Sequence, residues 1–107
     1  MAARMLREFM RAGTSTFGDW LDDLDAAAAA KITTALYRLE QGNFSNVASV
    51  GGGVYESKID FGPGYRIYFG QEGNALIILL GGGTKKTQRK DIERARRFWR
   101  EYGAGKE

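Results

Sequence analysis

The chain has 107 residues and a formal net charge of +3, and it contains neither cysteine nor histidine. The lack of these two residue types excludes disulfides, thiol catalysis, serine–histidine nucleophile pairs and metal sites built from thiolate or imidazole ligands. We therefore expect no metal and no cofactor, and any chemistry must be carried by Lys, Arg, Tyr, Asp and Glu.

The composition predicts one globular domain over residues 1–107, with residues 103–107 as a flexible tail. Hydrophobic residues make up 43% and charged residues 27%, which is ordinary for a soluble domain. No apolar run approaches the ~20 residues that a membrane span needs. The first residues carry several charges and no continuous apolar stretch, unlike a signal peptide. We expect a cytoplasmic protein with no membrane partner.

Helical spacing dominates the first half of the chain, after a short strand predicted within residues 5–11. Thr14 or Ser15 can cap a helix whose apolar residues recur at i, i+3, i+4 and i+7. Asp25 can cap a second helix, which Gly42-Asn43 would end. The expected apolar positions of the two helices are Phe17, Trp20, Leu21 and Leu24, then Ala28, Ile32, Ala35, Leu36 and Leu39.

From residue 51 onward the apolar period changes to two, which is typical of strands. The pattern predicts strands over residues 54–61, 65–69 and 75–80, followed by a helix over 88–102. The element order is then β-α-α-β-β-β-α. This order predicts an α+β fold, with a small antiparallel sheet and helices packed on one of its faces.

Alternation divides the predicted sheet into two faces. The face expected to pack on the helices carries Tyr55, Ile59, Ile67 and Phe69. The opposite face, expected to be polar and open, carries Glu56, Lys58, Arg66 and Tyr68. Such a surface can hold a phosphate and stack a base. The alternative is a solvated sheet face in which Glu56 forms a cross-strand pair with Lys58 or Arg66.

Positive charge gathers after the last strand, where residues 84–100 hold eight Lys and Arg against two Asp and Glu. This excess attracts phosphates or an acidic partner, unless it is only a solvated helix. The preceding Gly81-Gly82-Gly83 lacks the spacing of a P-loop, since Gly81 stands only four positions before Lys85. These glycines instead predict close backbone approach.

Two segments carry a resemblance to a known family: GVYESKIDFGPGYRIYF at 53–69 and ALIILLGGGTKKTQRKDIERA at 75–95. They resemble the RelE/ParE superfamily of toxins from type II toxin–antitoxin modules, in particular the HigB-like branch of addiction module killer proteins. The resemblance is strongest between residues 47 and 95. It implies a RelE-like fold and a ribosome-dependent mRNA endonuclease (an mRNA interferase), in which the RNA 2′-hydroxyl attacks the adjacent phosphate.

The resemblance also implies roles for individual residues. Arg66 would hold the scissile phosphate, Lys85 or Lys86 would share that work or protonate the leaving 5′-oxygen, and Lys58 or Glu56 would help remove the 2′-proton. The residues expected to contact RNA are Tyr68, Gln88, Arg89, Lys90, Arg94 and Arg97. Thr84 stands where some relatives carry an Asp or His.

Two other functions remain open at this point. One is a ParE-like gyrase poison, although such relatives usually lack the cations that Lys58, Arg66, Lys85 and Lys86 supply here. The other is a non-catalytic interaction module that binds nucleic acid or protein. For a toxin, the expected partners are mRNA, the ribosome and a cognate antitoxin. The antitoxin would be a small helix-turn-helix protein that alone connects the complex to operator DNA.

Overall fold

Side-chain caps start both helices of the first half, as the sequence predicts. Ser15 accepts a hydrogen bond from the backbone N–H of Gly18 (2.8 Å) at the start of α1 (Thr16–Asp22). Asp25 accepts one from Ala28 (2.8 Å) at the start of α2 (Ala26–Glu40). Each cap satisfies a backbone donor that the first helical turn leaves free.

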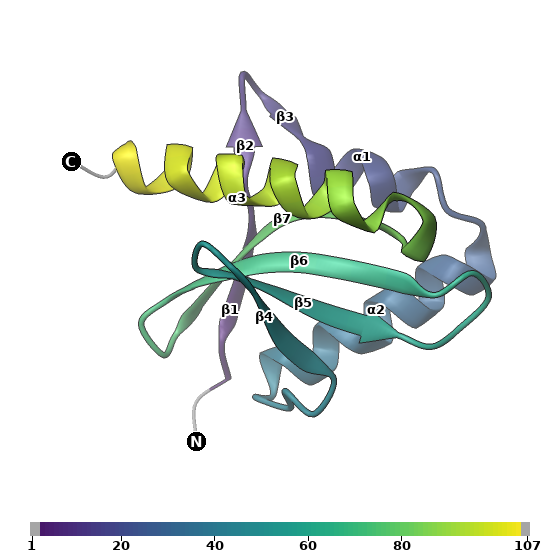
Figure 1. Ribbon diagram of the computed structural model, residues 1–107. Coiled ribbons are helices and arrows are strands. Elements are labelled where there is room, and N and C mark those ends of the chain that lie inside the picture. The colour runs from purple at the N-terminus through teal and green to yellow at the C-terminus, as the bar shows by residue number, and fades with distance from the viewer. Residues whose placement is uncertain (1–2, 106–107) are drawn as a thin grey trace.

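The computed structural model describes residues 3–105 and places a five-stranded sheet between these helices and a third one (Figure 1). The strand order is β1-β7-β6-β5-β4. The strands are β1 (Met5–Glu8), β4 (Val47–Gly51), β5 (Val54–Ile59), β6 (Tyr65–Glu72) and β7 (Leu76–Thr84). All neighbours are antiparallel except β1 and β7, which are parallel. The expected α+β class with a mainly antiparallel sheet is confirmed.

Several elements differ from the sequence-based prediction in extent. Strand β4 was not predicted, and residues 5–11 divide into β1 and β2 (Met10–Arg11), of which β2 pairs with β3 (Thr14–Ser15) in a separate ribbon. Strand β7 continues through its three glycines to Thr84. A 3₁₀ turn, η1 (Lys85–Thr87), leads into α3 (Gln88–Ala104), which extends into the predicted flexible tail. Residues 106–107 of that tail lie outside the described residues.

The helices occupy both faces of the sheet, not one as expected (Figure 1). Helices α1 and α2 cover the face that carries Ile67, Phe69 and Ile77, with Ile32 and Leu39 among their contributions to the core. Helix α3 packs on the opposite face. Its buried residues Ala95 and Phe98 join a second core with Val54, Tyr68, Ile78 and Leu80. The cause lies in β7, whose continuous apolar run over residues 76–80 requires cover on both faces.

Two strand glycines admit a tryptophan ring, one on each face. A Cβ on Gly82 would lie 2.3 Å from the Trp20 ring of α1, and one on Gly70 would lie 2.4 Å from the Trp99 ring of α3. Contacts this short are incompatible with any side chain. The close approach predicted for the glycine run of β7 is therefore confirmed at Gly82.

None of the helices within residues 3–105 combines the length and the apolar character needed to cross a lipid bilayer.

Candidate functional site

Four of the predicted cations come together at one end of the sheet. Lys58 on β5 is opposite Arg66 on β6, and Arg66 is opposite Gly83 on β7. Lys85 and Lys86 follow directly in η1. The N–H of Lys85 donates to the carbonyl of Gly64 (3.1 Å), which holds η1 against the turn between β5 and β6.

The three lysines of this end are exposed and free of carboxylate partners. Lys58, Lys85 and Lys86 each fall in the exposed class. Within residues 3–105, no ion pair involves any of the three. Unpaired ammonium groups grouped in this way produce a local positive potential that attracts an anion. We call Lys58, Lys85 and Lys86 the lysine site.

At the start of α3, its first residue Gln88 forms a polar cluster with the buried residues Glu56 and Arg66. The Gln88 amide donates to Glu56 Oε2 (2.8 Å), and Arg66 Nε lies 3.5 Å from the same oxygen. Arg66 also donates through Nη1 to the Gly64 carbonyl (3.2 Å). Glu56 and Arg66 are only 8% and 5% exposed. The cross-strand pair foreseen between Glu56 and Arg66 is therefore present, but inside the protein.

Tyr68 completes the polar part of this face, and it is 0% exposed. Burial raises the pKa of its phenol well above the ordinary value, and the negative charges of Glu56 and Asp91 raise that pKa further. Glu56 is close enough to affect the phenol, but the Tyr68 hydroxyl forms no hydrogen bond with it or with any other group among residues 3–105. Tyr68 thus stays protonated, and no base can stack on it.

Asp91 fixes the first turns of α3 over the cluster, a role that the sequence analysis missed. Its carboxylate accepts from the Thr87 hydroxyl (2.6 Å) and from the Arg94 guanidinium (3.2 Å). A Cβ on Gly83 would lie 1.9 Å from Asp91 Oδ2, so the carboxylate rests directly on the β7 backbone. The signal in the sequence was the pairing of a strand glycine with an acidic residue in the first turn of the next helix.

The sheet face expected to be open is thus only partly so. Alternation correctly places Glu56, Lys58, Arg66 and Tyr68 on one face, but α3 covers all of them except Lys58. The short η1 turn folds α3 directly back over the strands, and its apolar residues cover this face of β7. Arg66, predicted to hold the scissile phosphate, is 5% exposed, and its guanidinium contacts Glu56 and the Gly64 carbonyl.

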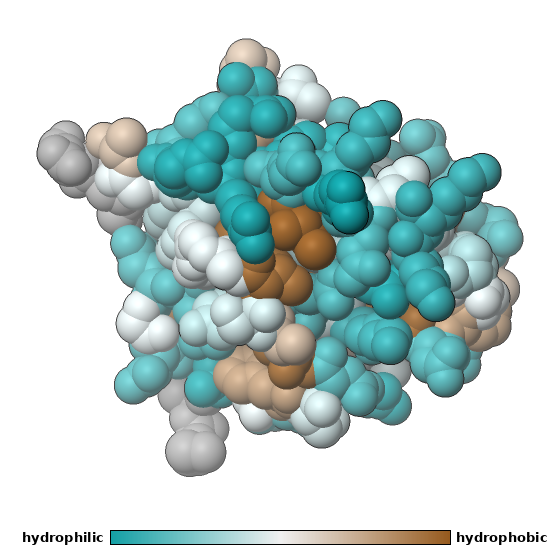
Figure 2. Space-filling model, viewed as in Figure 1, coloured by the Kyte–Doolittle hydropathy of each residue, from teal (hydrophilic) through white to brown (hydrophobic). Residues whose placement is uncertain are grey.

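The remaining predicted RNA contacts lie along α3. Arg89, Lys90 and Arg97 are exposed, whereas Arg94 is partly buried in its ion pair with Asp91. The Arg97 guanidinium lies 5.6 Å from the centroid of the Phe98 ring. Figure 2 shows hydrophilic side chains gathered over α3, with a hydrophobic patch between the helix and the strands. Tyr102 is packed rather than free, since its hydroxyl donates to Glu72 (3.0 Å).

The acidic residues of the chain do not group into a metal site within the described range. Across residues 3–105, no three of them lie close enough together to hold an ion. The chemistry that this end of the sheet offers is therefore that of ammonium groups beside a buried carboxylate–guanidinium pair.

The fold and the lysine site define a class of protein: a small α+β domain whose sheet carries a positively charged site at one end. A family model described as "Phage derived protein Gp49-like (DUF891)" matches residues 19–100. A Haemophilus influenzae protein, described only as uncharacterized, is similar to this chain at 45% identity over 91 residues, covering 84% of this chain and 92% of the relative.

The chain belongs to the Gp49-like family. This is a family of toxin–antitoxin toxins related to the RelE-like toxins, so membership implies a cognate antitoxin. The matched range spans α2, the strands β4 to β7 and most of α3, and it includes all of the lysine site.

Proposed function

We propose that the chain is the toxin of a type II toxin–antitoxin module and cleaves mRNA on the ribosome, in the manner expected of the HigB-like branch. The observation that carries the proposal is the lysine site: three exposed ammonium groups at one end of the sheet, without ion-pair partners among residues 3–105. RNA cleavage through its own 2′-hydroxyl needs no metal, only groups that hold the phosphate, accept one proton and donate another.

The lysine site can supply these groups. Lys85 and Lys86 would bind the scissile phosphate and stabilise the extra negative charge of the transition state, and one of them would protonate the leaving 5′-oxygen. The 2′-proton would go to the carboxylate of Glu56, or to Lys58 when its side chain is the neutral amine, since an ammonium group cannot accept a proton. Glu56 is covered by Gln88 and paired with Arg66, so Lys58 is the more accessible of the two.

The rest of the positive surface would attach the toxin to its target. Arg89 and Lys90, exposed at the start of α3, would contact phosphates of ribosomal RNA without reading sequence. A cognate antitoxin of the helix-turn-helix type would neutralise the toxin in the cytoplasm, and the complex would reach operator DNA through the antitoxin alone.

Expression in bacteria tests the proposal. The wild-type chain should arrest growth, and primer extension should reveal mRNA ends in phase with codons. Lys86→Gln and Lys58→Gln should relieve the arrest, whereas Arg7→Gln, an exposed cation on the opposite edge strand β1, should not. Thermal melting of each purified variant establishes that it is folded.

Three outcomes would contradict the proposal. Growth arrest with DNA breaks and no codon-phased RNA ends would identify a gyrase poison. A folded wild-type chain without toxicity would identify an interaction module. Undiminished toxicity of both folded lysine variants would remove the lysine site from the mechanism.

A further inference from the structure

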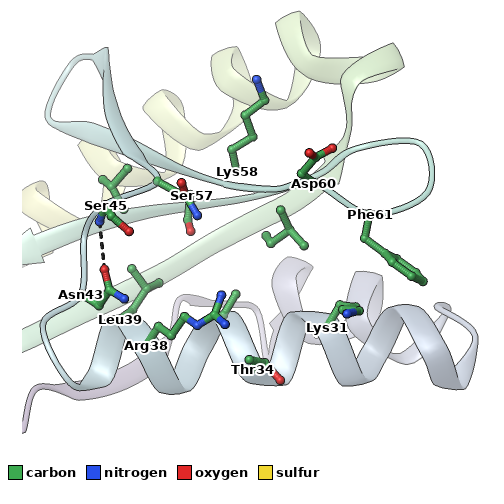
Figure 3. A pocket seen from close by; sticks show the side chains of 14 residues that line it. Lys31, Thr34, Arg38, Leu39, Asn43, Ser45, Ser57, Lys58, Asp60 and Phe61 are labelled. Carbon is green, nitrogen blue, oxygen red and sulfur yellow. Dashed lines mark hydrogen bonds between the residues drawn. The ribbon is translucent and has the colours of Figure 1, made fainter.

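A groove opens on the other side of the β5 edge, away from α3. It lies between α2, the following loop and the ends of β4 and β5, and its volume is about 270 Å³ (Figure 3). Its lining includes the cations Lys31 and Arg38, one acidic residue, Asp60, and also Lys58, whose side chain points away from α2. The groove is therefore positively charged, on a face where the sequence analysis expected only core packing.

Lys31 and Arg38, the two cations of α2, are spaced so that each can contact a different anionic group of one ligand. Lys31 and Arg38 stand seven residues apart on α2, two turns along one side, and so about 10 Å apart along the helix axis. Both are exposed. Within residues 3–105, the Arg38 side chain forms no ion pair or hydrogen bond. The Lys31 ammonium lies 5.3 Å from the centroid of the Phe61 ring, which holds it at one end of the groove.

The groove and the lysine site lie on opposite sides of the end of β5, close to one another. Strand β4 pairs with β5 only as far as Ser57, and Lys58 still donates its N–H to the Asn46 carbonyl (3.0 Å). Beyond Lys58, β5 has no strand beside it on that side among the described residues. In Figure 3 the Lys58 side chain points away from α2, while Arg38 and Lys31 come from α2 itself. A flexible polyanion could thus pass from one surface to the other around this edge.

We propose that this groove binds single-stranded RNA flanking the nucleotides at the lysine site, with backbone phosphates against Arg38 and Lys31. The proposal rests on the proposed function, because that function brings RNA to Lys58. Sites for single strands combine a positively charged groove that follows the backbone with an aromatic side chain, and Phe61 lines this groove. Because the contacts are to the backbone, the groove adds affinity without adding sequence preference.

Binding of 2′-O-methyl RNA, which cannot cleave itself, tests the proposal with the full chain. The probes are a fluorescent dodecanucleotide and a trinucleotide, the latter too short to reach the groove. Arg38→Gln should weaken binding of the dodecanucleotide about fivefold and leave the trinucleotide unchanged. It should also reduce the slope of log affinity against log salt by about 0.7, the value for one phosphate contact on a single strand. Lys31→Gln should act in the same direction.

Two further variants keep this result separate from the proposed function. Arg7→Gln, the matched control on β1, should bind both probes as the wild type does. Lys86→Gln should weaken both probes, because both occupy the lysine site. If cells show no codon-phased RNA ends but the dodecanucleotide still depends on Arg38, the groove proposal stands and the cleavage proposal fails.

Other results would overturn the groove proposal. These are wild-type affinity for the dodecanucleotide in both folded groove variants, or no salt-dependent binding by the wild-type chain. An Arg38→Gln variant that loses affinity for the antitoxin but not for RNA would equally overturn it, and would assign the groove to an acidic protein segment.

Discussion

The two faces of the sheet are built from the same alternating strands but closed in different ways. The face under α1 and α2 is mainly apolar, with Ile67, Phe69 and Ile77 at its centre, and becomes polar only at the groove near the end of β5. The face under α3 is apolar only around Tyr68 and Phe98, and toward the start of α3 it changes to the buried pair of Glu56 and Arg66. The comparison shows that the face under α1 and α2 mainly stabilises the fold. On the face under α3, polar groups beside the lysine site replace part of the apolar core.

The largest effect should come from the apolar face. Phe69 is 0% exposed and stacks near Phe44 and Tyr55, with centroid separations of 6.4 and 5.8 Å. Phe69→Ala should lower the free energy of unfolding by about 3–5 kcal/mol, since it removes a large apolar side chain and leaves a cavity. Urea denaturation measures the loss. Tyr37→Ala, at an exposed position of α2, should change stability by less than about 0.5 kcal/mol.

Breaking the buried pair on the other face should cost somewhat less. Glu56→Ala leaves Arg66 buried without its carboxylate, and we expect a loss of about 3 kcal/mol. The double variant Glu56→Ala/Arg66→Met should recover part of that loss, because neither charge then remains buried. If the loss in the double variant, measured by urea denaturation, equalled the sum of the losses in Glu56→Ala and Arg66→Met, the pair would not be coupled.

The two glycines under the tryptophans allow a matched comparison of the faces. Gly82→Ala meets the Trp20 ring and Gly70→Ala meets the Trp99 ring at nearly the same distance. Each should cost about 1–3 kcal/mol through overpacking, seen as a lower melting temperature. Gly73→Ala serves as control for a Cβ without neighbours, although its positive φ adds some backbone strain. A much smaller decrease in melting temperature for Gly70→Ala than for Gly82→Ala would mean that α3 and its Trp99 ring shift more easily to make room for the added methyl group.

The smallest effect should come from the Tyr68 hydroxyl. Because this buried group has no hydrogen-bond partner among residues 3–105, Tyr68→Phe should be neutral or stabilising by up to about 1 kcal/mol.

The raised pKa of Tyr68 adds a dependence on pH to that comparison. In the unfolded chain the phenol ionises near pH 10, while the folded protein keeps it protonated, so the wild type loses stability as pH rises above 10. Tyr68→Phe should lose less over the same range, as urea denaturation at pH 9 and 11 would show. Identical pH profiles would contradict the raised pKa.

Much of the fold could be predicted from the sequence because local signals were strong. Ser15 and Asp25 cap helices as predicted, and period-two alternation assigned Ile67 and Phe69 to the helical face. Strand β4 was missed because Val47–Gly51 is short and half exposed. The parallel pairing of β1 with β7 was missed because pairing between distant segments leaves no local trace in the sequence.

The candidate site was predicted only in part, because a local sequence pattern carries only part of the information. Alternation reports which side of a strand a residue faces, and it placed Lys58 and Arg66 together correctly. It does not report what covers that side. The path of η1 turns α3 over Glu56 and Arg66, and the contact of Asp91 with Gly83 that fixes it depends on tertiary geometry. The groove at Arg38 was not predicted, because the sequence pattern of α2 indicates only an amphipathic helix.

The pairing of Met5 on β1 with Leu76 on β7 has a consequence for how the protein is made. During synthesis the first strand emerges from the ribosome long before its neighbour exists, and it must wait unpaired until nearly the whole chain has been translated. The lysine site is completed equally late, because Lys85 and Lys86 follow β7. The order of translation thus delays assembly of the basic end of the sheet.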